Sequence, residues 1–502
     1  MSKKELNCTE VWLLTGTQHL YGDETLKQVS TNANEIVNYF NSNVELPIKI
    51  VCKNILTNSE SIKAACLEAN ANADCIGIIA WMHTFSPAKM WIAGLVQLKK
   101  PFAHLHTQYH REIPWDKIDM DFMNLNQSAH GDREFGFISA RLRQRRKVIV
   151  GHWRDDDVAY ELDNWMRAAL AYADGQKLKI ARIGGMNMRD VAVTGGDRVE
   201  AQIQLGWSIN GYGVSDLVEH IKAVSESDIT TVIEQYESQY NLMPILQKNA
   251  ERHQELRESA RQEIGLQTFL NEGNFKAFTT TFEDLYGLEQ LPGLACQRLM
   301  AAGYGFGAEG DWKTAALVRA MKVMSQGLSG GVSFMEDYTY HLVPNDELVL
   351  GAHMLEVCPS IAAERPALEI HPLGIGGKKD PCRLIFAAAL GSAINVSLID
   401  MGGRMRLIMG ELDVVAPQHP MPKLPVAYAL WRPRPDFKQG CQAWILSGGS
   451  HHASFAQALD PKIIEDYATM VGIELISINS ETKIRELKQE LFLNDMAYRL
   501  SR

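Results

Sequence analysis

The sequence predicts an α/β protein with a parallel doubly wound N-terminal sheet, a mixed α/β central domain and a β-rich, barrel-like C-terminal domain. Three observations favour this fold class. Strand and helix patterns alternate in the first third of the chain, a strand and long helical stretches follow, and short β-rich runs dominate after Glu347. The 502 residues, 46% of them hydrophobic, suffice for two to four domains with separate cores. We expect the domains at residues 1–177, 178–331 and 332–502.

The first third of the chain repeats a strand-helix unit. Residues 11–15 form an apolar run typical of a buried strand, and Asp23 is the expected N-cap of a helix with one apolar face. Further strands are expected at 48–51, 75–81 and 101–105, and a helix at 59–69. Another helix is expected to open at Ser86-Pro87, since serine is a good N-cap and proline suits the first helical position. This alternation predicts a parallel sheet.

Polar side chains follow the strands of this predicted sheet. Ligands of such sheets bind beyond the carboxyl ends of the strands, and those ends carry Gln18-His19, His83-Thr84-Phe85 and His104-Leu105-His106. Any single histidine there is also explained by capping of a strand or by a bond to the backbone. Their gathering at one edge favours a polar pocket.

Beyond residue 177 the pattern changes twice. A strand is expected at 178–183 and a long helical stretch near 227–273. After Glu347, β-rich runs at 348–357, 368–372, 383–389, 394–399, 406–409 and 443–446 predict an antiparallel sheet or barrel. Prolines between 417 and 425 indicate an irregular surface segment, and helices are expected at 461–471 and 482–491.

Charge and cysteine usage exclude several classes of protein. The net charge of −10 argues against nucleic acid or an anionic membrane as a partner. A basic run at 141–147 (Arg141, Arg143, Arg145, Arg146, Lys147) ends a helical pattern, so we interpret it as a solvated face or a subunit contact. The eight cysteines, Cys8 among them, form no Cys-x-x-Cys pair and are expected to be reduced thiols of a cytoplasmic protein. No signal core or stretch of about 20 apolar residues occurs, so neither secretion nor membrane insertion is expected.

Four polar residues stand in unusually apolar, glycine-rich surroundings: Glu309, Glu336, His353 and His452. A buried charge without a partner costs several kcal/mol or more, so this set calls for a cation or a hydrogen-bond partner. Two carboxylates and two imidazoles suit Mn²⁺, Fe²⁺ or Co²⁺ better than Ca²⁺. For either glutamate, a buried ion pair with a cation such as Lys313 is the alternative.

The glycine motif at 305–310 matches a dinucleotide fingerprint letter for letter. It follows a helical pattern and carries an acid, Glu309, where phosphate would bind, so we expect no nucleotide cofactor.

Longer strings of residues are more specific than these patterns. They are Gly-Thr-Gln-His-Leu-Tyr-Gly (16–22), Trp-Met-His-Thr-Phe-Ser-Pro-Ala-Lys-Met-Trp (81–91), Asp-Met-Asp-Phe-Met-Asn-Leu-Asn-Gln (119–127), Thr-Thr-Thr-Phe-Glu-Asp-Leu (279–285), Gly-Asp-Trp-Lys-Thr (310–314), Phe-Met-Glu-Asp-Tyr-Thr-Tyr (334–340) and His-Met-Leu-Glu-Val-Cys-Pro (353–359). In these strings the chain resembles bacterial L-arabinose isomerases from end to end.

The resemblance implies a three-domain protomer and a Mn²⁺-dependent conversion of L-arabinose to L-ribulose, and of D-galactose to D-tagatose, with one ion per subunit. It implies a homohexamer whose active sites lie between subunits. Its metal ligands would be Glu309, Glu336, His353 and His452, and its sugar contacts Gln18, Leu20, Phe85, His130, Met188, Phe282, Ile375 and His451.

The residues agree with this chemistry. Aldose-ketose isomerisation needs an acid/base pair and stabilisation of an enediolate, and Glu309 and Glu336 are the acid/base candidates. A metal-assisted hydride shift would use the same ligands, so both routes stay open.

Other activities explain less of the sequence. A non-catalytic sugar-binding protein would use Gln18, Phe85 and His130 but not the acids and histidines of the metal set. A metallohydrolase usually has closely spaced ligands, whereas these are spread over more than a hundred residues. An isomerase for a related sugar such as L-fucose is the third alternative.

Overall fold

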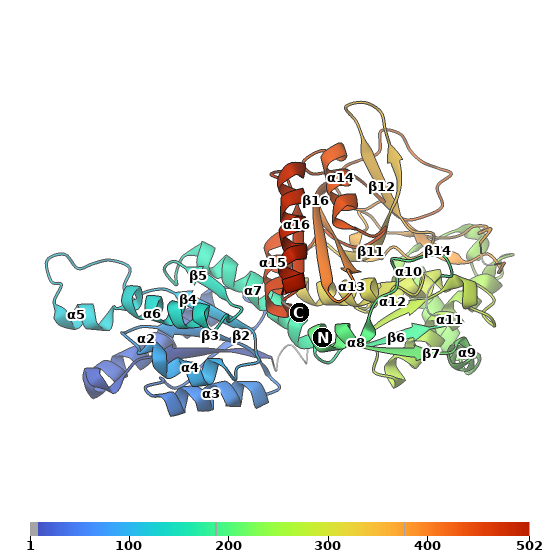
Figure 1. The fold of residues 1–502 in the computed structure, drawn as a ribbon. Coiled ribbons are helices and arrows are strands. Elements are labelled where there is room, and N and C mark those ends of the chain that lie inside the picture. Colours follow the sequence, from blue (N-terminus) through green and yellow to red (C-terminus); the bar gives the residue numbers. More distant parts are fainter. Residues whose placement is uncertain (1–8, 186–187, 376, 501–502) are drawn as a thin grey trace. The chain divides into compact units, whose positions relative to one another are not determined.

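A computed structural model describes residues 9–185, 188–375 and 377–500 (Figure 1). The chain divides into two compact units, each described by itself below. The first unit runs to Ala173 and includes Lys462–Gly472; the second holds Asp174–Pro461 and the chain from Ile473 onward. The domain boundaries expected after residues 177 and 331 stay predictions.

The first unit is built on a parallel sheet, as predicted, and a fifth strand, β5, joins the four that the sequence indicated. Its strand order is β2-β1-β3-β4-β5. The strands are β1 (Glu10–Gly16), β2 (Lys49–Cys52), β3 (Cys75–Met82), β4 (Phe102–His106) and β5 (Lys147–Val150). The helices are α2 (Gly22–Asn43), α3 (Ser59–Ala71), α4 (Ile92–Leu95), α5 (Met120–Leu125), α6 (Ser128–Arg141), α7 (Asp156–Gly175) and α15 (Pro461–Val471).

Both faces of this sheet are buried. Because side chains alternate along a strand, Trp12 and Leu14 of β1 lie on the face that packs with α3, α4 and α6. Val11 and Leu13 are equally buried, and α2 contacts β1 and β2. The strands therefore read as continuous apolar runs, as parallel strands covered on both faces do.

Two predicted caps in the first unit are wrong. Helix α2 begins at Gly22, so Asp23 lies inside its first turn, where its charge still complements the helix dipole. Ser86 accepts a hydrogen bond from Trp91 Nε1 at 3.2 Å and caps nothing. The helix expected at Ser86-Pro87 is a 3₁₀ turn at Ala88–Trp91, followed by the short α4.

The second unit combines a parallel sheet, a small sheet and a β-barrel. The parallel sheet has the order β10-β9-β6-β7, and the small one β14-β13-β8. In the large sheet, β15-β18-β11-β12-β17-β16-β19, the additional pairing of β15 with β16 closes six strands into a ring. This confirms the predicted β-rich, barrel-like architecture.

The bounds of its strands are β6 (Lys179–Ile183), β7 (Ser208–Tyr212), β8 (Asn241–Leu242), β9 (Ala277–Thr280), β10 (Gly305–Gly307), β11 (Val332–His341), β12 (Leu348–Ala352), β13 (Ala367–Ile370), β14 (Cys382–Ile385), β15 (Gly391–Asp400), β16 (Met405–Val414), β17 (Tyr428–Pro433), β18 (His452–Ala456) and β19 (Glu474–Ile478). The helices are α8 (Arg198–Leu205), α9 (Val214–Lys222), α10 (Glu226–Gln239), α11 (His253–Glu272), α12 (Gly293–Ala301), α13 (Trp312–Met324), α14 (Phe437–Ser447) and α16 (Ile484–Leu500).

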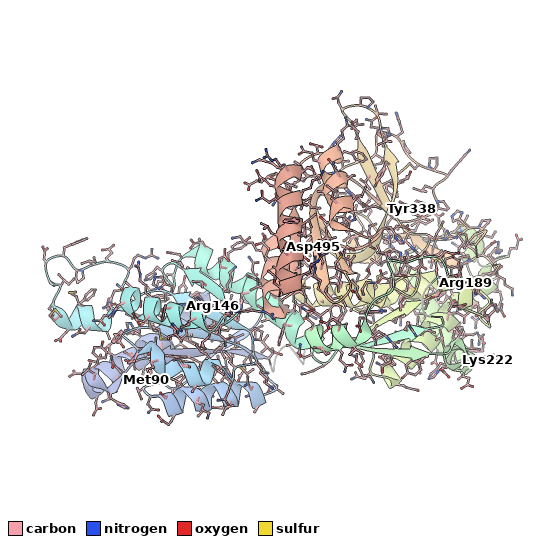
Figure 2. The ribbon with its side chains drawn as sticks, in the orientation of Figure 1. Met90, Arg146, Arg189, Lys222, Tyr338 and Asp495 are labelled. Atoms are coloured by element: carbon pink, nitrogen blue, oxygen red, sulfur yellow. The ribbon has the colours of Figure 1, made fainter. Side chains whose placement is uncertain are left out.

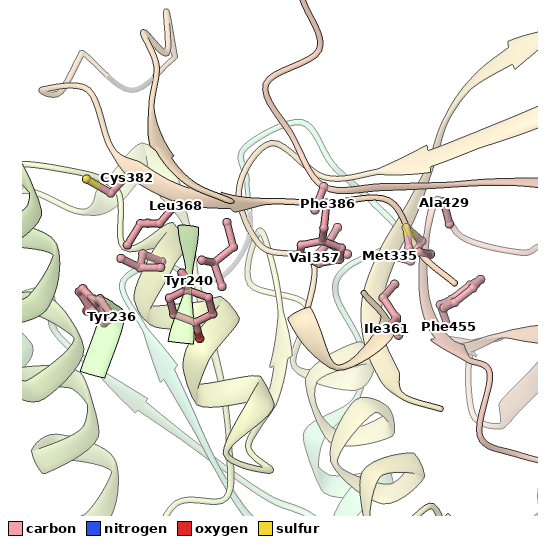
Figure 3. Close-up of a cluster of buried hydrophobic side chains, with 14 of the residues drawn as sticks. Tyr236, Tyr240, Met335, Val357, Ile361, Leu368, Cys382, Phe386, Ala429 and Phe455 are labelled. Atoms are coloured by element: carbon pink, nitrogen blue, oxygen red, sulfur yellow. The ribbon is translucent and has the colours of Figure 1, made fainter. Parts of the chain in front are cut away.

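Helix α13 is the centre of the second unit. It contacts β6, β9 and β10 of the parallel sheet and also β11, β15 and β18 of the barrel (Figure 1). All but one of its thirteen residues are buried, as expected for a helix covered on more than one side. A second core joins α10, the small sheet and the barrel strands, with Met335 and Phe455 among its side chains (Figure 3).

Two predictions for the second unit are wrong. The helical stretch expected at 227–273 is broken between α10 and α11, where Asn241–Leu242 pairs with β13 and Pro244 opens a 3₁₀ turn. The strand expected at 443–446 lies inside α14. Asp436 caps that helix by accepting from the N–H of Gln439, and Gly448 ends it in a left-handed conformation.

Seven of the eight cysteines lie within the described residues, and all seven are free thiols, as expected. Cys8 lies outside the described residues. Within the described ranges, none of the helices combines the length and apolar character that crossing a membrane demands.

One strand-end histidine, His83, is part of the core of the first unit. Its ring is completely buried and stacks on Trp81 with 4.4 Å between ring centroids. Its Nε2 lies 2.7 Å from the amide nitrogen of Asn32. Burial lowers the pKa of His83 to about 3, so the ring is neutral at ordinary pH.

His83 should make the first unit sensitive to acid. Its folded pKa lies below the unfolded value of about 6.5, so its stabilising effect is complete above that value and is lost as the pH falls towards 3. Each pH unit in this window costs up to about 1.4 kcal/mol. When the pH is lowered from about 7 to about 5, the melting temperature of His83→Gln should therefore fall less than that of the unsubstituted protein.

The matched control is His19→Gln, which removes an exposed histidine of the same unit. Melting curves at several pH values should give this variant the slope of the unsubstituted protein. Equal slopes for all three proteins would show that His83 contributes nothing to acid sensitivity.

Candidate metal centre

Glu309 stands in a strained turn between β10 and α13. Its φ is 61°, a left-handed conformation rare for a residue with a side chain, and Gly310 follows with φ 78°. The preceding glycines let strand and helix touch. A Cβ at Gly305 would lie 2.0 Å from the carbonyl oxygen of Ala315, and one at Gly307 would lie 2.3 Å from that of Asp311. The Gly-x-Gly pattern is thus explained by backbone contact.

The other three candidates come from adjacent barrel strands. Glu336 on β11 is paired with His452 on β18 and with Ala352 on β12, and His353 directly follows β12. Met335 packs into the core shown in Figure 3, whereas Phe334 belongs to the core around the parallel sheet. Glu336 shares the face of Phe334, because side chains alternate along a strand. The three strands thus carry their polar groups to one place.

Short distances connect these side chains. The Oε2 atom of Glu309 lies 3.7 Å from Nε2 of His452, and Oε2 of Glu336 lies 3.8 Å from Nε2 of His353. One ligand atom each of Glu309, His353 and His452 lies within 4.8 Å of the other two. The ring of Phe334 lies 4.9 Å from both histidine rings and forms an apolar wall.

Two carboxylates outside the predicted set orient the histidines. Glu356 lies 2.5 Å from Nδ1 of His353, and Asp311 lies 3.1 Å from Nδ1 of His452. A carboxylate that accepts from Nδ1–H leaves the lone pair of Nε2 free for a metal ion. Sequence reasoning missed both acids; the only signal was that each lies two or three residues from a predicted ligand.

The Nε2 atom of His452 is the best indicator of a missing partner. It is buried, and it makes no hydrogen bond within the part of the chain that the structure describes. Buried polar atoms are nearly always satisfied, so this atom calls for a group that accepts its lone pair. Glu and His donors around it suit a divalent transition-metal ion.

The alternative partner, Lys313, is engaged elsewhere. Its Nζ donates to the carbonyl oxygens of Val193 and Thr194 at 3.0 and 2.9 Å and lies 3.4 Å from Asp311. Among the described residues it forms no ion pair with Glu309 or Glu336.

The charges of the centre are coupled. Burial alone would raise the pKa of Glu309, but the imidazoles of His451, His452 and His353 outweigh it and leave that pKa lowered. Burial lowers the pKa of His452. For His353 burial acts in the same direction, but Glu356 outweighs it and raises the pKa. Glu309 thus stays ionised, and His452 stays neutral, as a metal ligand must be.

Some predicted sugar contacts accompany this centre in the second unit. Nε2 of His451 lies 3.6 Å from Oε2 of Glu309, and the interaction with this carboxylate raises the pKa of His451. Phe282 follows β9 in a 3₁₀ turn and packs partly on the core there. Met188 and Ile375 lie half-buried in loops.

The remaining predicted contacts form a separate group in the first unit. The side-chain amide of Gln18 donates to the carbonyl oxygen of Phe85 at 2.8 Å. The rings of Phe85 and His130 stack with 4.5 Å between centroids. Leu20 is 79% exposed, which is unusual for a large apolar side chain. The structure therefore joins Gln18, Phe85 and His130 within that unit.

Comparison with known proteins identifies the family of the chain. Three family models match in succession: the L-arabinose isomerase N-terminal domain at residues 5–177, the central domain at 179–327 and the C-terminal domain at 331–474. An L-arabinose isomerase of Geobacillus stearothermophilus is 58% identical over 490 residues, 98% of each chain. Those of Herpetosiphon aurantiacus and Serratia proteamaculans are 57% and 55% identical over 498 and 494 residues, covering 99% and 98% of each chain. The chain therefore belongs to the L-arabinose isomerase family and is an isomerase.

Proposed function

We propose that this protein converts L-arabinose to L-ribulose, and D-galactose to D-tagatose, by aldose-ketose isomerisation in L-arabinose catabolism. The observation that carries the proposal is the convergence of Glu309, His353 and His452, with Glu336 beside His353, in a chain whose relatives are named L-arabinose isomerases. Seven free thiols support a reducing compartment, so we place the enzyme in the cytoplasm.

Glu309, Glu336, His353 and His452 would hold one Mn²⁺ ion per subunit. The fit is supported by the unsatisfied Nε2 of His452 and by the carboxylates behind both histidines. Bound there, the ion would supply a positive charge that acidifies sugar hydroxyls and offsets charge developing on oxygen. With two neutral imidazoles and two carboxylates, the loaded site would be formally neutral.

The protein's own groups supply acid/base catalysis. Glu309 lies beside His452 and Glu336 beside His353, so one glutamate can remove the C2 proton while the other serves the neighbouring oxygens. Met188, Phe282, Ile375 and His451 would position the sugar beside them. Transfer of solvent deuterium to C1 of the ketose in heavy water supports this enediol route, whereas complete retention of the C2 hydrogen favours a hydride shift.

The activity and its metal dependence can be tested together. Ketose formation is measured with L-arabinose, D-galactose and L-fucose in parallel. We expect L-ribulose to form fastest, chelator dialysis to abolish turnover, and Mn²⁺ to restore it better than Mg²⁺, which prefers all-oxygen octahedral sites. No ketose from any sugar contradicts the enzyme assignment. Faster turnover of L-fucose contradicts the substrate, and full activity after metal removal contradicts the metal.

Neighbouring histidines should have different roles. His452→Ala should lose bound manganese, because its buried Nε2 points at the centre, whereas His451→Ala should keep the metal and lose turnover or sugar affinity. Elemental analysis of purified protein and kcat and KM values separate these effects. His419→Ala, an exposed histidine of the same unit, is the control and should change neither. Equal metal content in the His451 and His452 variants would disprove the assignment.

We also propose a homohexamer in which the first unit of one chain completes the metal site of another. What supports this is the separation of the predicted site: Gln18, Leu20, Phe85 and His130 belong to the first unit, the metal set to the second. A largely exposed leucine, Leu20, among the predicted sugar contacts fits a surface that meets another chain.

Two inactive variants should then rescue each other. Glu309→Gln damages the metal ligands of a site, and His130→Ala damages the sugar contacts that another chain supplies. If each site takes these two parts from two different chains, about a quarter of the sites in randomly mixed oligomers carry neither defect. Co-expressed, differentially tagged variants should recover about that fraction of activity. Each variant alone, assembled but nearly inactive, is the control. Mixed oligomers with only the summed activity of the two parents would rule out shared sites and leave the isomerase assignment intact.

A further inference from the structure

A basic cavity lies in the first unit, away from the strand ends described above. Its volume is about 360 Å³, and its walls come from the segment around Lys99 and Lys100, the turn 143–147 between α6 and β5, and α15. Arg146, labelled in Figure 2, directly precedes β5. Trp165 and Tyr172 of α7 complete the lining.

Positive charge in this cavity exceeds negative charge. Six cations line it, Lys99, Lys100, Arg143, Arg145, Arg146 and Lys147, against one carboxylate, Asp466. Asp466 is bound by Lys147 at 3.1 Å, and Lys147 also pairs with Glu161. The side chains of Lys99, Arg143 and Arg145 form no hydrogen bond or ion pair with any residue the structure describes. Such a concentration is unusual in a chain with a net charge of −10.

Two buried donors in the same walls also have no acceptor. These are Nε of Arg146 and the indole Nε1 of Trp165, neither of which meets an acceptor in the described chain. The other nitrogens of Arg146 donate to the carbonyl oxygens of Gln144 and Gly136, both at 3.3 Å, which fixes its guanidinium. A ligand rich in acceptor oxygens would satisfy both donors.

Backbone conformation and hydrogen bonds fix the turn that carries Arg143, Arg145 and Arg146. Arg143 has φ 54°, a left-handed conformation, and the side-chain amide of Gln144 donates to the carbonyl oxygen of Leu95 at 2.7 Å. Gly472, with φ 67°, leaves room for Arg145, since a Cβ there would lie 1.8 Å from its Cζ atom. Helix α6 ends at Arg141, so the cations at 143–147 lie outside the helix. Favourable interaction with the helix dipole, which is strongest within the last helical turn, therefore does not explain them.

We propose that this cavity binds a small phosphorylated anion. Guanidinium groups match phosphate oxygens with paired hydrogen bonds, and the cavity volume lies in the range typical of small-molecule sites. A neutral aldose would leave the charges uncompensated, so the ligand is distinct from the sugar of the proposed reaction. An extended polyanion is disfavoured by the carboxylate of Asp466 in the wall and by Glu161, which pairs with Lys147.

The test is equilibrium dialysis of the full-length metal-loaded protein with radiolabelled pyrophosphate and with ribose 5-phosphate. Both should bind, more weakly as salt rises, and saturating L-arabinose should not displace them. Arg143→Glu combined with Arg145→Glu should weaken binding at least about tenfold. Lys27→Glu combined with Lys63→Glu, exposed lysines of the same unit, makes the same change in net charge and should have no effect.

The outcomes separate the alternatives. Unchanged binding in the double arginine variant, displacement by L-arabinose, or equally tight binding of citrate would overturn the proposal. A further contrary outcome combines two results: the unsubstituted protein binds neither phosphate compound, and the double arginine variant sediments as a dissociated oligomer. The cations would then form a subunit contact, and the proposal would be wrong. Circular dichroism checks folding, and Arg145→Gln alone replaces the double variant if that variant does not fold.

Discussion

The buried carboxylate of Asp311 connects the parts of the second unit that the metal centre needs. It caps α13 by accepting from the N–H of Thr314 at 3.1 Å, lies 3.4 Å from the ammonium of Lys313, and orients His452 on the barrel. Burial alone would raise the pKa of this carboxylate, but the nearby Lys313, His452 and Thr314 outweigh that effect, lower the pKa and keep the group ionised. Helix, loop and barrel therefore meet at one ionised group, and Glu309 lies two residues away from it.

Local sequence predicted the fold class and most of the first unit. The strands at 11–15, 75–81 and 101–105 lie within one residue of β1, β3 and β4, because runs buried on both faces are strong signals. Strands β11 and β18 were not predicted, although they carry Glu336 and His452. Polar residues such as Glu336, Asp337 and His452 stand in these strands and break the apolar alternation that marks a strand, as is common where a functional site replaces core residues.

The sequence predicted those residues of the candidate site that stand in unusual surroundings, but not the residues that support them. Glu309, His353 and His452 are conspicuous because acids and histidines rarely stand among glycine, phenylalanine and methionine, and the structure brings the three together. Asp311 looks like an ordinary helix cap, and its contact with His452 spans 141 residues of sequence. Such pairings depend on how α13 packs against the barrel, which no local pattern encodes.

Histidines at one edge of the parallel sheet show how the environment decides the role of a side chain. The ring of His83 is stacked on Trp81, and burial lowers its pKa. His106 lies 2.7 Å from the buried Asp132, which also binds His104, and this hydrogen bond raises its pKa. One strand end thus holds a neutral imidazole and the next favours a cation, although the sequence presents both as polar residues after an apolar run. A carboxylate in helix α6, 26 residues from His106 in sequence, makes the difference. Charge at this edge is therefore set by which helix packs over each strand, and a pattern of histidines alone cannot reveal it.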